Sequence, residues 1–198
     1  MKRRDFIKES AAITGGLTLT GIGSSIILGC STSETFKISL AEWSLHRSLQ
    51  SGDIDHLDFY SIAKKEFGIS AVEYVNSFFF DKAKNLTYLK EMKTRADDLG
   101  VKSLLIMCDN EGNLGDPDSK KRTQAIENHY KWVEAAQYLG WHSIRVNARS
   151  FGTYNEQIEL ATDGLRRLTE FGDTLDINTI VENPVSYTHL TLPTICSV

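Results

Sequence analysis

One unit recurs along this chain: an amphipathic stretch that ends in a large apolar residue and a glycine, followed a few residues later by a short apolar run. The apolar–glycine pairs are Phe67-Gly68, Leu99-Gly100, Leu139-Gly140 and Phe171-Gly172. A glycine directly after the last helical turn is typical of a helix that ends in a left-handed residue, so each pair predicts a helix C-terminus. An apolar residue that folds back on such a cap follows the first three pairs, whereas Asp173 follows the fourth.

The short apolar runs have the length of strands. They are residues 36–40, 71–75, 103–107, 143–146 and 177–181. In the intervening stretches apolar residues recur at helical spacing, least regularly in the first helix, residues 56–67. Asp116-Pro117 is a start signal for the third helix, and Thr153 with Glu156 is a capping box for the fourth. Five strands that alternate with four helices predict βα units and a parallel sheet.

The chain length favours part of a barrel over a complete smaller fold. A full eight-unit barrel takes roughly 250 residues, so five of its strands need about 150 to 160, which fits residues 36–183. The alternative is a five-stranded doubly wound sheet, which would bind its ligand at a topological switch point. No glycine-rich phosphate loop follows the first strand, which weakens that alternative. We therefore predict an α/β fold, a partial (β/α)8 TIM barrel with about five strands and four helices.

Charge and cysteine spacing argue against two kinds of protein, a nucleic-acid binder and a disulfide- or zinc-stabilised domain. The formal net charge is −4 with no long run of like charges, which disfavours a nucleic-acid partner. The three cysteines, Cys30, Cys108 and Cys196, are too widely spaced for a disulfide framework or a zinc knuckle. Cys108 is predicted to be a small buried side chain.

Residues 1–30 have the features of an export signal. Arg3-Arg4 and their neighbours resemble a twin-arginine motif, and a glycine- and hydroxyl-rich apolar stretch follows. A transmembrane anchor is the alternative, but such a composition has weak affinity for a bilayer. The stretch closes on a lipoprotein-like box that ends at Cys30, so we predict lipidation of Cys30 and a polar tether at residues 31–35. The predicted location is the periplasm, with attachment to the membrane through the lipid.

Polar residues lie at the end of each predicted strand, where barrel enzymes carry their chemistry. They are Glu42, Trp43 and His46, then Glu73 and Asn76, then Asp109, then Arg145 and Asn147, and finally Glu182 and Asn183. Loops are polar in any protein, so a single position of this kind indicates little. Glu73 and Glu182 are different because they lie within or at the end of apolar runs, where an uncompensated carboxylate costs several kcal/mol. They are predicted to have a cation or metal beside them.

Two further features are open to more than one interpretation. The run Phe78-Phe79-Phe80 predicts either an apolar lid over the site or a contact patch for a partner. His56 is interpreted as part of a solvated helix start, and His129 as a residue on a helix face.

Five segments together resemble the exported branch of the sugar phosphate isomerase/epimerase family, a group of xylose isomerase-like TIM barrels. They are residues 39–46, 71–76, 99–107, 142–147 and 180–183. The resemblance implies a divalent metal, Mn²⁺, Mg²⁺ or Co²⁺, held at the barrel mouth by carboxylates and a histidine. The first ligand in this family is a glutamate that ends strand five, which is Glu182 here; the other ligands belong to strands six to eight, which this sequence does not contain.

The same resemblance implies the reaction and its partner. The substrate is a small-molecule sugar or polyol, and paired carboxylates move a proton on and off the carbon beside a carbonyl. Glu182 would be a metal ligand and one of the acid–base groups. The residues implied to bind the substrate are Trp43, His46, Glu73, Arg145 and Asn147. Two alternatives stay open: a lipid-anchored carbohydrate-binding barrel without catalysis, and the endonuclease relative of the same superfamily, which the acidic balance disfavours.

The final segment departs from the family pattern. From Val185 the residues can be back-translated into a transposon-end adapter used in sequencing libraries, and they lack both the helical period and the punctuation of the repeat. A genuine β-rich tail is the alternative. We predict that residues 184–198 are a non-native tail, and that the chain as written is poorly soluble and inactive because its sheet is open at both edges.

Overall fold

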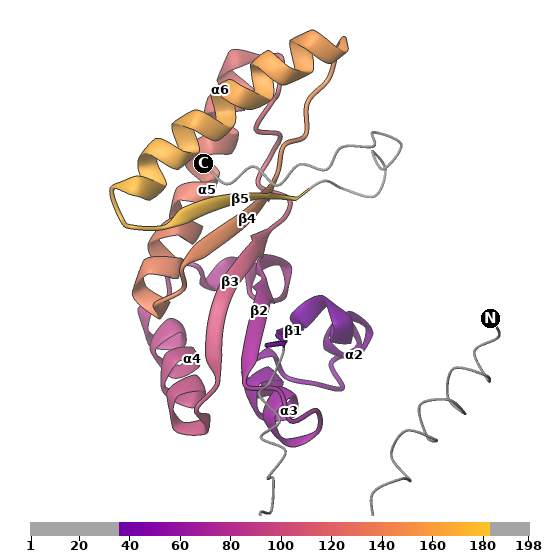
Figure 1. The fold of residues 1–198 in the computed structure, drawn as a ribbon, viewed down its shortest axis with the longest axis vertical. Helices are drawn as coiled ribbons and strands as arrows, with labels where there is room; N and C mark the ends of the chain where they lie inside the picture. The colour runs from indigo at the N-terminus through magenta and orange to yellow at the C-terminus, as the bar shows by residue number, and fades with distance from the viewer. Residues whose placement is uncertain (1–35, 183–198) are drawn as a thin grey trace, which may run out of the picture. The chain divides into compact units, whose positions relative to one another are not determined.

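The computed structural model describes residues 36–182, in which five parallel strands alternate with helices (Figure 1). The first half comprises β1 (Leu40–Ala41), the 3₁₀ helix η1 (Glu42–Leu45), α2 (His46–Ser51), η2 (His56–Asp58), α3 (Phe59–Lys65) and β2 (Ala71–Val75). The second half comprises η3 (Asn76–Phe78), η4 (Phe80–Lys82), α4 (Leu86–Leu99), β3 (Lys102–Cys108), α5 (Ser119–Leu139), β4 (Ser143–Asn147), α6 (Tyr154–Asp173) and β5 (Asn178–Glu182).

The strands follow one another in the sheet in the order of the sequence, β1-β2-β3-β4-β5, and every neighbouring pair is parallel. A doubly wound sheet would reverse its strand order at a switch point, so that alternative is wrong. Sequential parallel order is the order of a barrel wall. The predicted α/β architecture with five strands is therefore confirmed, with five α-helices rather than four in the described part.

Several predictions concern residues beyond the described part. The leader with Cys30, the tether at residues 31–35, Asn183 and the tail at residues 184–198 all lie outside it. The chain divides into two units after Phe36, and the barrel wall belongs to the unit that starts at Lys37. Within residues 36–182, every helix is too short or too polar to cross a bilayer.

Two of the four predicted glycine caps are confirmed, Gly100 as the C-cap of α4 and Gly140 as the C-cap of α5. α3 ends earlier, with Glu66 as its C-cap, so Gly68 is left-handed but lies two residues beyond the cap. Gly68, Gly100 and Gly140 have φ of 67°, 61° and 76°, the left-handed region that favours glycine. The apolar residue after the cap also closes back on the helix: the Val101 N–H donates to the Ala96 carbonyl and the Trp141 N–H to the Ala136 carbonyl, each at 2.9 Å. These helix ends are encoded locally.

The fourth predicted cap is wrong. α6 continues through Phe171-Gly172 to Asp173, and the left-handed residue is Asp176, with φ of 58°. Gly172 serves another purpose, because a Cβ built on it would lie 2.5 Å from the Ile177 carbonyl oxygen. The Ile177 N–H donates to the Gly172 carbonyl at 3.0 Å, so the glycine lets the chain turn closely into β5.

The first βα unit differs most from prediction. Of the predicted strand 36–40 only Leu40 pairs with the sheet, together with Ala41, and the chain turns at Glu42 into η1 and the unpredicted helix α2. α2 ends at Gly52, with φ of 78°. The other strands match prediction to within one or two residues, and the capping box of Thr153 with Glu156 at the start of α6 is confirmed.

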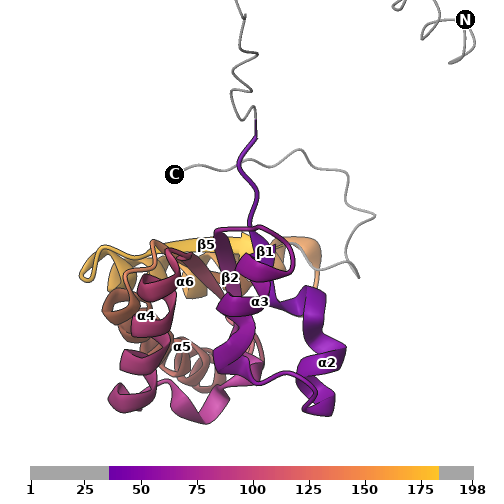
Figure 2. The ribbon, with the colours of Figure 1, turned by 90° about the horizontal axis from the view of Figure 1, so that it is seen from below.

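One face of the sheet is packed against helices. Figure 2 shows α3, α4 and α5 on the same side of the strands. Residues of this face alternate along the strands and are buried, as for Tyr74, Ile106 and Ile144. Tyr74 stacks on Trp141 with ring centroids 5.1 Å apart. Cys108 is 2% exposed on this face, as predicted.

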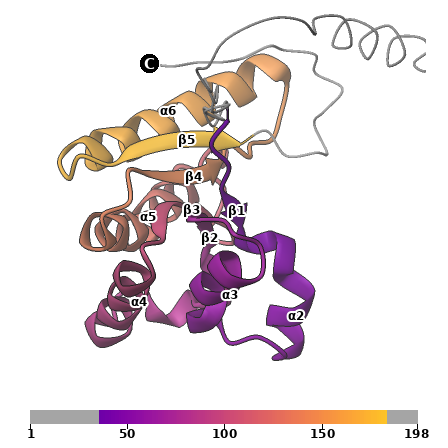
Figure 3. The same ribbon diagram turned by 60° about the horizontal axis from the view of Figure 1, so that its bottom comes forward.

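The other face is the inner wall of the barrel, and the strands curve around it (Figure 3). The register aligns Glu73 with Leu105, Met107 with Arg145, and Arg145 with Ile180 on this face. These five side chains are half-buried or exposed, and Ile180 is 38% exposed. The inner wall is therefore lined by apolar and charged groups that remain at least partly accessible.

Candidate active site

An arginine and a glutamate lie side by side at the C-terminal ends of β4 and β5. The parallel register puts Arg145 opposite Ile180 and Asn147 opposite Glu182, so both charged residues belong to the inner face. Glu182 Oε2 is 3.4 Å from Arg145 Nε, and the two side chains are 34% and 27% exposed. Both atoms are shielded from solvent and have no hydrogen-bond partner. The prediction of a cation beside Glu182 is confirmed, and the cation is Arg145.

Arg145 also contacts the neighbouring strand. Its Nη2 is 3.0 Å from Sδ of Met107, which faces it across the β3–β4 register. The guanidinium is thus held between an apolar sulfur and a carboxylate, with most of its hydrogen-bonding capacity unused. Such a group is suited to bind a hydroxyl or carbonyl oxygen brought to the strand ends.

Three strand ends are joined by a hydrogen-bonded group of amides and an acid. The Asn76 side chain accepts from the Asp109 N–H at 2.9 Å and donates to the Asp109 carbonyl at 2.8 Å. Asn147 Nδ2 donates to Asp109 Oδ1 at 2.9 Å. The ends of β2, β3 and β4 are therefore fixed relative to one another, and Asn147 retains its carbonyl oxygen and one N–H for a ligand.

Trp43 and His46 form a separate aromatic group on η1 and α2. Their rings stack with centroids 4.7 Å apart and an interplanar angle of 10°, and His46 Nδ1 is 2.7 Å from the Trp43 carbonyl. Phe78 approaches Trp43 at 6.1 Å. Trp43 remains 47% exposed. A flat exposed ring of this kind is suited to stack on a sugar ring.

Glu73 has a hydroxyl partner where a cation was predicted. The Ser39 Oγ donates to Glu73 Oε1 at 2.6 Å, and the side chain faces the partly open inner wall, where water can solvate it. The half-open inner face removes the desolvation penalty on which that prediction rested. Glu73 lies two residues before the strand end, below the level of Glu182.

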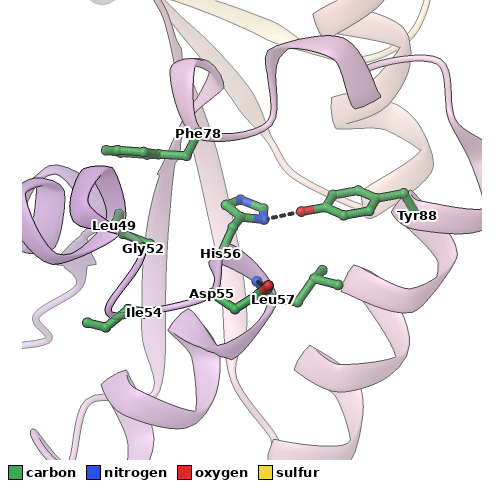
Figure 4. A pocket seen from close by; sticks show the side chains of 8 residues that line it. All are labelled: Leu49, Gly52, Ile54, Asp55, His56, Leu57, Phe78 and Tyr88. Atoms are coloured by element: carbon green, nitrogen blue, oxygen red, sulfur yellow. Dashed lines mark hydrogen bonds between the residues drawn. The ribbon is translucent and has the colours of Figure 1, made fainter.

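The phenylalanine run does not behave as one unit. Phe79 is 2% exposed in the core, edge-on to Trp132 at 5.3 Å, whereas Phe80 is 40% exposed beneath the Lys131 ammonium group at 4.5 Å. Phe78 lines a cavity of about 360 Å³ between α2, η2 and α4 (Figure 4). Neither the lid nor the partner patch describes Phe79, which is a core residue.

The interpretation of His56 as solvated is wrong. His56 is 8% exposed, with Nδ1 2.6 Å from the Tyr88 hydroxyl and Nε2 3.3 Å from Glu42 Oε1. Burial lowers the pKa of His56 to about 4 and raises the pKa of Glu42 well above its usual range, although the Val75 N–H opposes the rise for Glu42. Both shifts favour a neutral imidazole at neutral pH.

Sequence reasoning also missed Glu111. This acid is 3% exposed, accepts a hydrogen bond from Trp132 Nε1 and pairs with Lys131 Nζ at 2.9 Å. It is flanked by Asn110 and Gly112, so its sequence context is that of an ordinary polar loop and carries no signal of burial. His129 is likewise buried, and its Nδ1–H donates to the Ala125 carbonyl within α5 at 2.7 Å.

The described residues supply one candidate metal ligand and no more. Residues 36–182 contain no group of three or more histidine, cysteine, aspartate or glutamate side chains that could hold an ion. Glu182 Oε2 is a buried carboxylate oxygen without a hydrogen-bond donor, which is suited to meet a cation, but its closest charge is Arg145. A metal centre at this position would need further ligands from outside the described range.

The sequence matches the family of xylose isomerase-like TIM barrels over residues 63–193. This match covers more than half of the chain, so the chain belongs to that family. The resemblance stated from the sequence segments, and the predicted partial TIM barrel of the xylose isomerase-like type, are thereby confirmed. No curated protein matches the chain in sequence.

Solved structures with the same fold include several sugar enzymes. A 3-keto-D-glucoside 4-epimerase from E. coli is 17% identical with a TM-score of 0.50, over 59% of this chain and 47% of its own. A D-psicose 3-epimerase studied with D-fructose is 14% identical with a TM-score of 0.52, over 73% and 51%. An IolI protein with a bound zinc atom is 11% identical with a TM-score of 0.59, over 74% and 51%. The chain thus spans about half the length of the structures it matches.

Proposed function

We propose that this chain is part of an exported, metal-dependent sugar isomerase or epimerase that transfers a proton at the carbon beside a carbonyl. The observation that carries the proposal is the Glu182 carboxylate, which ends β5 on the inner wall beside Arg145 in a xylose isomerase-like barrel. Support comes from two similar structures named as sugar epimerases and one named with zinc.

The residues of this chain would act on the sugar as follows. The Glu182 carboxylate accepts the proton from the substrate carbon and returns it, with the Arg145 guanidinium beside it. The free N–H and carbonyl of Asn147 bind sugar hydroxyls, and Trp43 with His46 provides a stacking surface. Glu73 adds an acceptor on the inner wall.

A divalent ion, Mn²⁺, Mg²⁺ or Co²⁺, would be bound by Glu182 and by ligands from the rest of the barrel. It would supply polarisation of the sugar carbonyl and its neighbouring hydroxyl, which makes the adjacent proton more acidic. Since residues 36–182 contribute a single ligand, we propose this ion only for a full-length protein that also contains strands six to eight.

The proposal is tested with the full-length protein and a panel of ketohexoses and keto-glucosides in deuterated water. We expect deuterium to enter the carbon beside the carbonyl, with loss of exchange after chelation and recovery with Mn²⁺ or Co²⁺. A protein that is folded and metal-loaded yet exchanges no proton in any sugar of the panel would contradict it.

A second candidate is a lipid-anchored carbohydrate-binding barrel without catalysis. The exposed Trp43 ring, which needs no metal to bind a sugar, favours it. Binding of a sugar by metal-free protein, without isotope exchange, would support this candidate over the enzyme.

We also propose export by the twin-arginine route and lipid attachment through Cys30 to the periplasmic face of the membrane. The support is the sequence pattern of residues 1–30. Replacing both Arg3 and Arg4 by lysine should leave the protein in the cytoplasm, and Cys30→Ser should release it from the membrane without preventing export. Membrane attachment that persists in Cys30→Ser would contradict the lipid anchor.

A further inference from the structure

Glu42 lies at the point where β1 leaves the sheet. Backbone pairing of β1 with β2 stops at the pair Ala41 and Glu73, because the chain turns into η1. A longer β1 would have offered a carbonyl to the Val75 N–H. Glu42 Oε2 takes that place and accepts from Val75 at 2.9 Å. A side chain therefore continues the ladder of hydrogen bonds beyond the end of the strand.

The second oxygen of Glu42 connects to more distant elements. Oε1 lies 3.3 Å from His56 Nε2 without a hydrogen bond between them, and His56 Nδ1 is hydrogen-bonded to the Tyr88 hydroxyl at 2.6 Å. Figure 4 shows His56 directed toward Tyr88 across the wall of the cavity. These contacts connect η1, η2 and α4, and Glu42 is fully buried. It is closed to solvent and so is unsuited to act on a substrate directly.

Trp43 directly follows Glu42 in η1. η1 has only four residues, and Ala41 at its start gives no side-chain cap. A 3₁₀ turn this short is weakly held by its own hydrogen bonds. The fixed contacts of Glu42 are the only buried polar anchor in η1 within the described structure. The Trp43 ring, by contrast, is 47% exposed.

We propose that Glu42, held by Val75 and by the pair His56–Tyr88, is a positioning residue that sets the orientation of the Trp43 ring at the strand ends. The identity of the stacked ligand as a sugar rests on the proposed function. The order of the Trp43 ring does not, since it can be measured without any ligand.

Tryptophan fluorescence of the whole chain at micromolar concentration provides the measurement. Trp132 and Trp141 are 0% and 3% exposed, so acrylamide should quench mainly Trp43, and Trp43→Phe identifies its share of the emission. In Glu42→Leu we expect about a twofold rise in the quenching constant of Trp43 and a faster decay of its anisotropy. Glu42→Gln should restore the wild-type values, because its amide accepts from Val75 and donates to His56.

Leu168→Ala is the control for a general loss of stability. Leu168 is fully buried on α6, and truncating it should destabilise the fold by about 2 to 5 kcal/mol. In Leu168→Ala the quenching constant and the anisotropy decay of Trp43 should equal those of the wild type. The proposal is overturned if Glu42→Leu leaves Trp43 unchanged, or if Leu168→Ala changes Trp43 as much as Glu42→Leu does.

If Glu42→Leu does not fold, Tyr88→Phe tests whether these contacts orient the Trp43 ring. This variant removes one hydroxyl, leaves the ring packing intact and deprives His56 Nδ1 of its partner. We expect an intermediate loss of Trp43 anisotropy, and wild-type anisotropy would overturn the proposal. Because these assays contain no sugar, their failure bears on Glu42 alone, whereas failure of the proposed enzyme would appear in the isotope exchange.

Discussion

Glu42 and Glu182 occupy equivalent places at the two edges of the sheet and have opposite surroundings. Each follows or ends an edge strand at its C-terminal end. Glu42 is 0% exposed and is held by the Val75 N–H and His56, whereas the Glu182 side chain is 34% exposed and faces Arg145. Position at a strand end therefore does not decide whether a carboxylate is available for chemistry.

The partners of the two acids account for the difference. Glu42 contacts two groups that are fixed in the core, the Val75 backbone N–H and the buried His56 ring, and burial raises the pKa of Glu42. Glu182 lies beside the Arg145 guanidinium on a half-open face, and its Oε2 has no hydrogen-bond partner. The first arrangement stabilises the fold and the second is open to a ligand.

The largest expected effect separates the two acids by activity. In the full-length protein, Glu182→Gln should lower the rate of proton exchange about 10³-fold, because a positioned acid–base group contributes on that scale. Its free energy of unfolding should change little. Glu170→Gln, an exposed acid paired with Arg166 on α6, is the matched control. A wild-type rate of proton exchange in Glu182→Gln would contradict the role of Glu182 as the acid–base group.

The next effect separates them by stability. Glu42→Leu should lower the free energy of unfolding by up to about 3 kcal/mol, since it leaves the Val75 N–H buried without a partner. Glu182→Leu should change it by less than about 1 kcal/mol, because that site is partly solvated. Urea denaturation at pH 7 measures both. Equal losses would show that the two sites are not distinct.

The pH dependence of folding sharpens the view of the Glu42 site. The pKa of His56 is lowered from 6.5 to about 4 by burial, so the unfolded chain binds the proton more readily between these values. The stability from His56 is complete above pH 6.5 and is lost as the pH falls to about 4, by at most about 3 kcal/mol. The raised pKa of Glu42 has the opposite sign, with its contribution lost as the pH rises.

The measurement is urea denaturation at a series of pH values from 4 to 7. His56→Gln should flatten the loss on the acid side, because glutamine does not titrate. An unchanged slope in His56→Gln would show that another group is responsible.

The smallest expected effect tests the inner wall as a whole. The exposed inner face and the open sheet edges should make the 198-residue chain self-associate. Ile180→Lys, on the inner face, should weaken association by about tenfold, which corresponds to about 1.4 kcal/mol. Ile158→Lys on α6, where Ile158 is 47% exposed, should have no such effect. Sedimentation velocity distinguishes them, and equal effects would contradict the contrast between the two faces.

The alternation of strands and helices, and the ends of most helices, could be predicted because they depend on residues that are neighbours in the sequence. Local backbone preferences and apolar periodicity account for the glycine caps at Gly100 and Gly140, the capping box at Thr153 and four of the five strands. The position of Glu182 at a strand end also follows from the apolar run that precedes it in the sequence. Arg145 was selected as a strand-end residue, but its pairing with Glu182 depends on the register between β4 and β5.

The errors share one cause, which is a partner far away in the sequence. Gly172 was assigned to a cap because its local context is that of one, but its carbonyl and Cα pack against Ile177 after a turn. Phe79 was interpreted as part of a lid or of a contact patch, although it packs edge-on against Trp132 in the core. His56 was assigned to solvent, although Tyr88 lies 32 residues later and Glu42 on another element.

By itself the sequence determined the alternation of strands and helices and where most of them end, since each of those choices is made within a few residues. Only the tertiary structure decided which of the strand-end acids is buried and which is accessible. The reason is that burial and hydrogen-bond partners come from other elements: the group that fixes Glu42 is Val75, 33 residues away, and the group that faces Glu182 is Arg145, on the neighbouring strand.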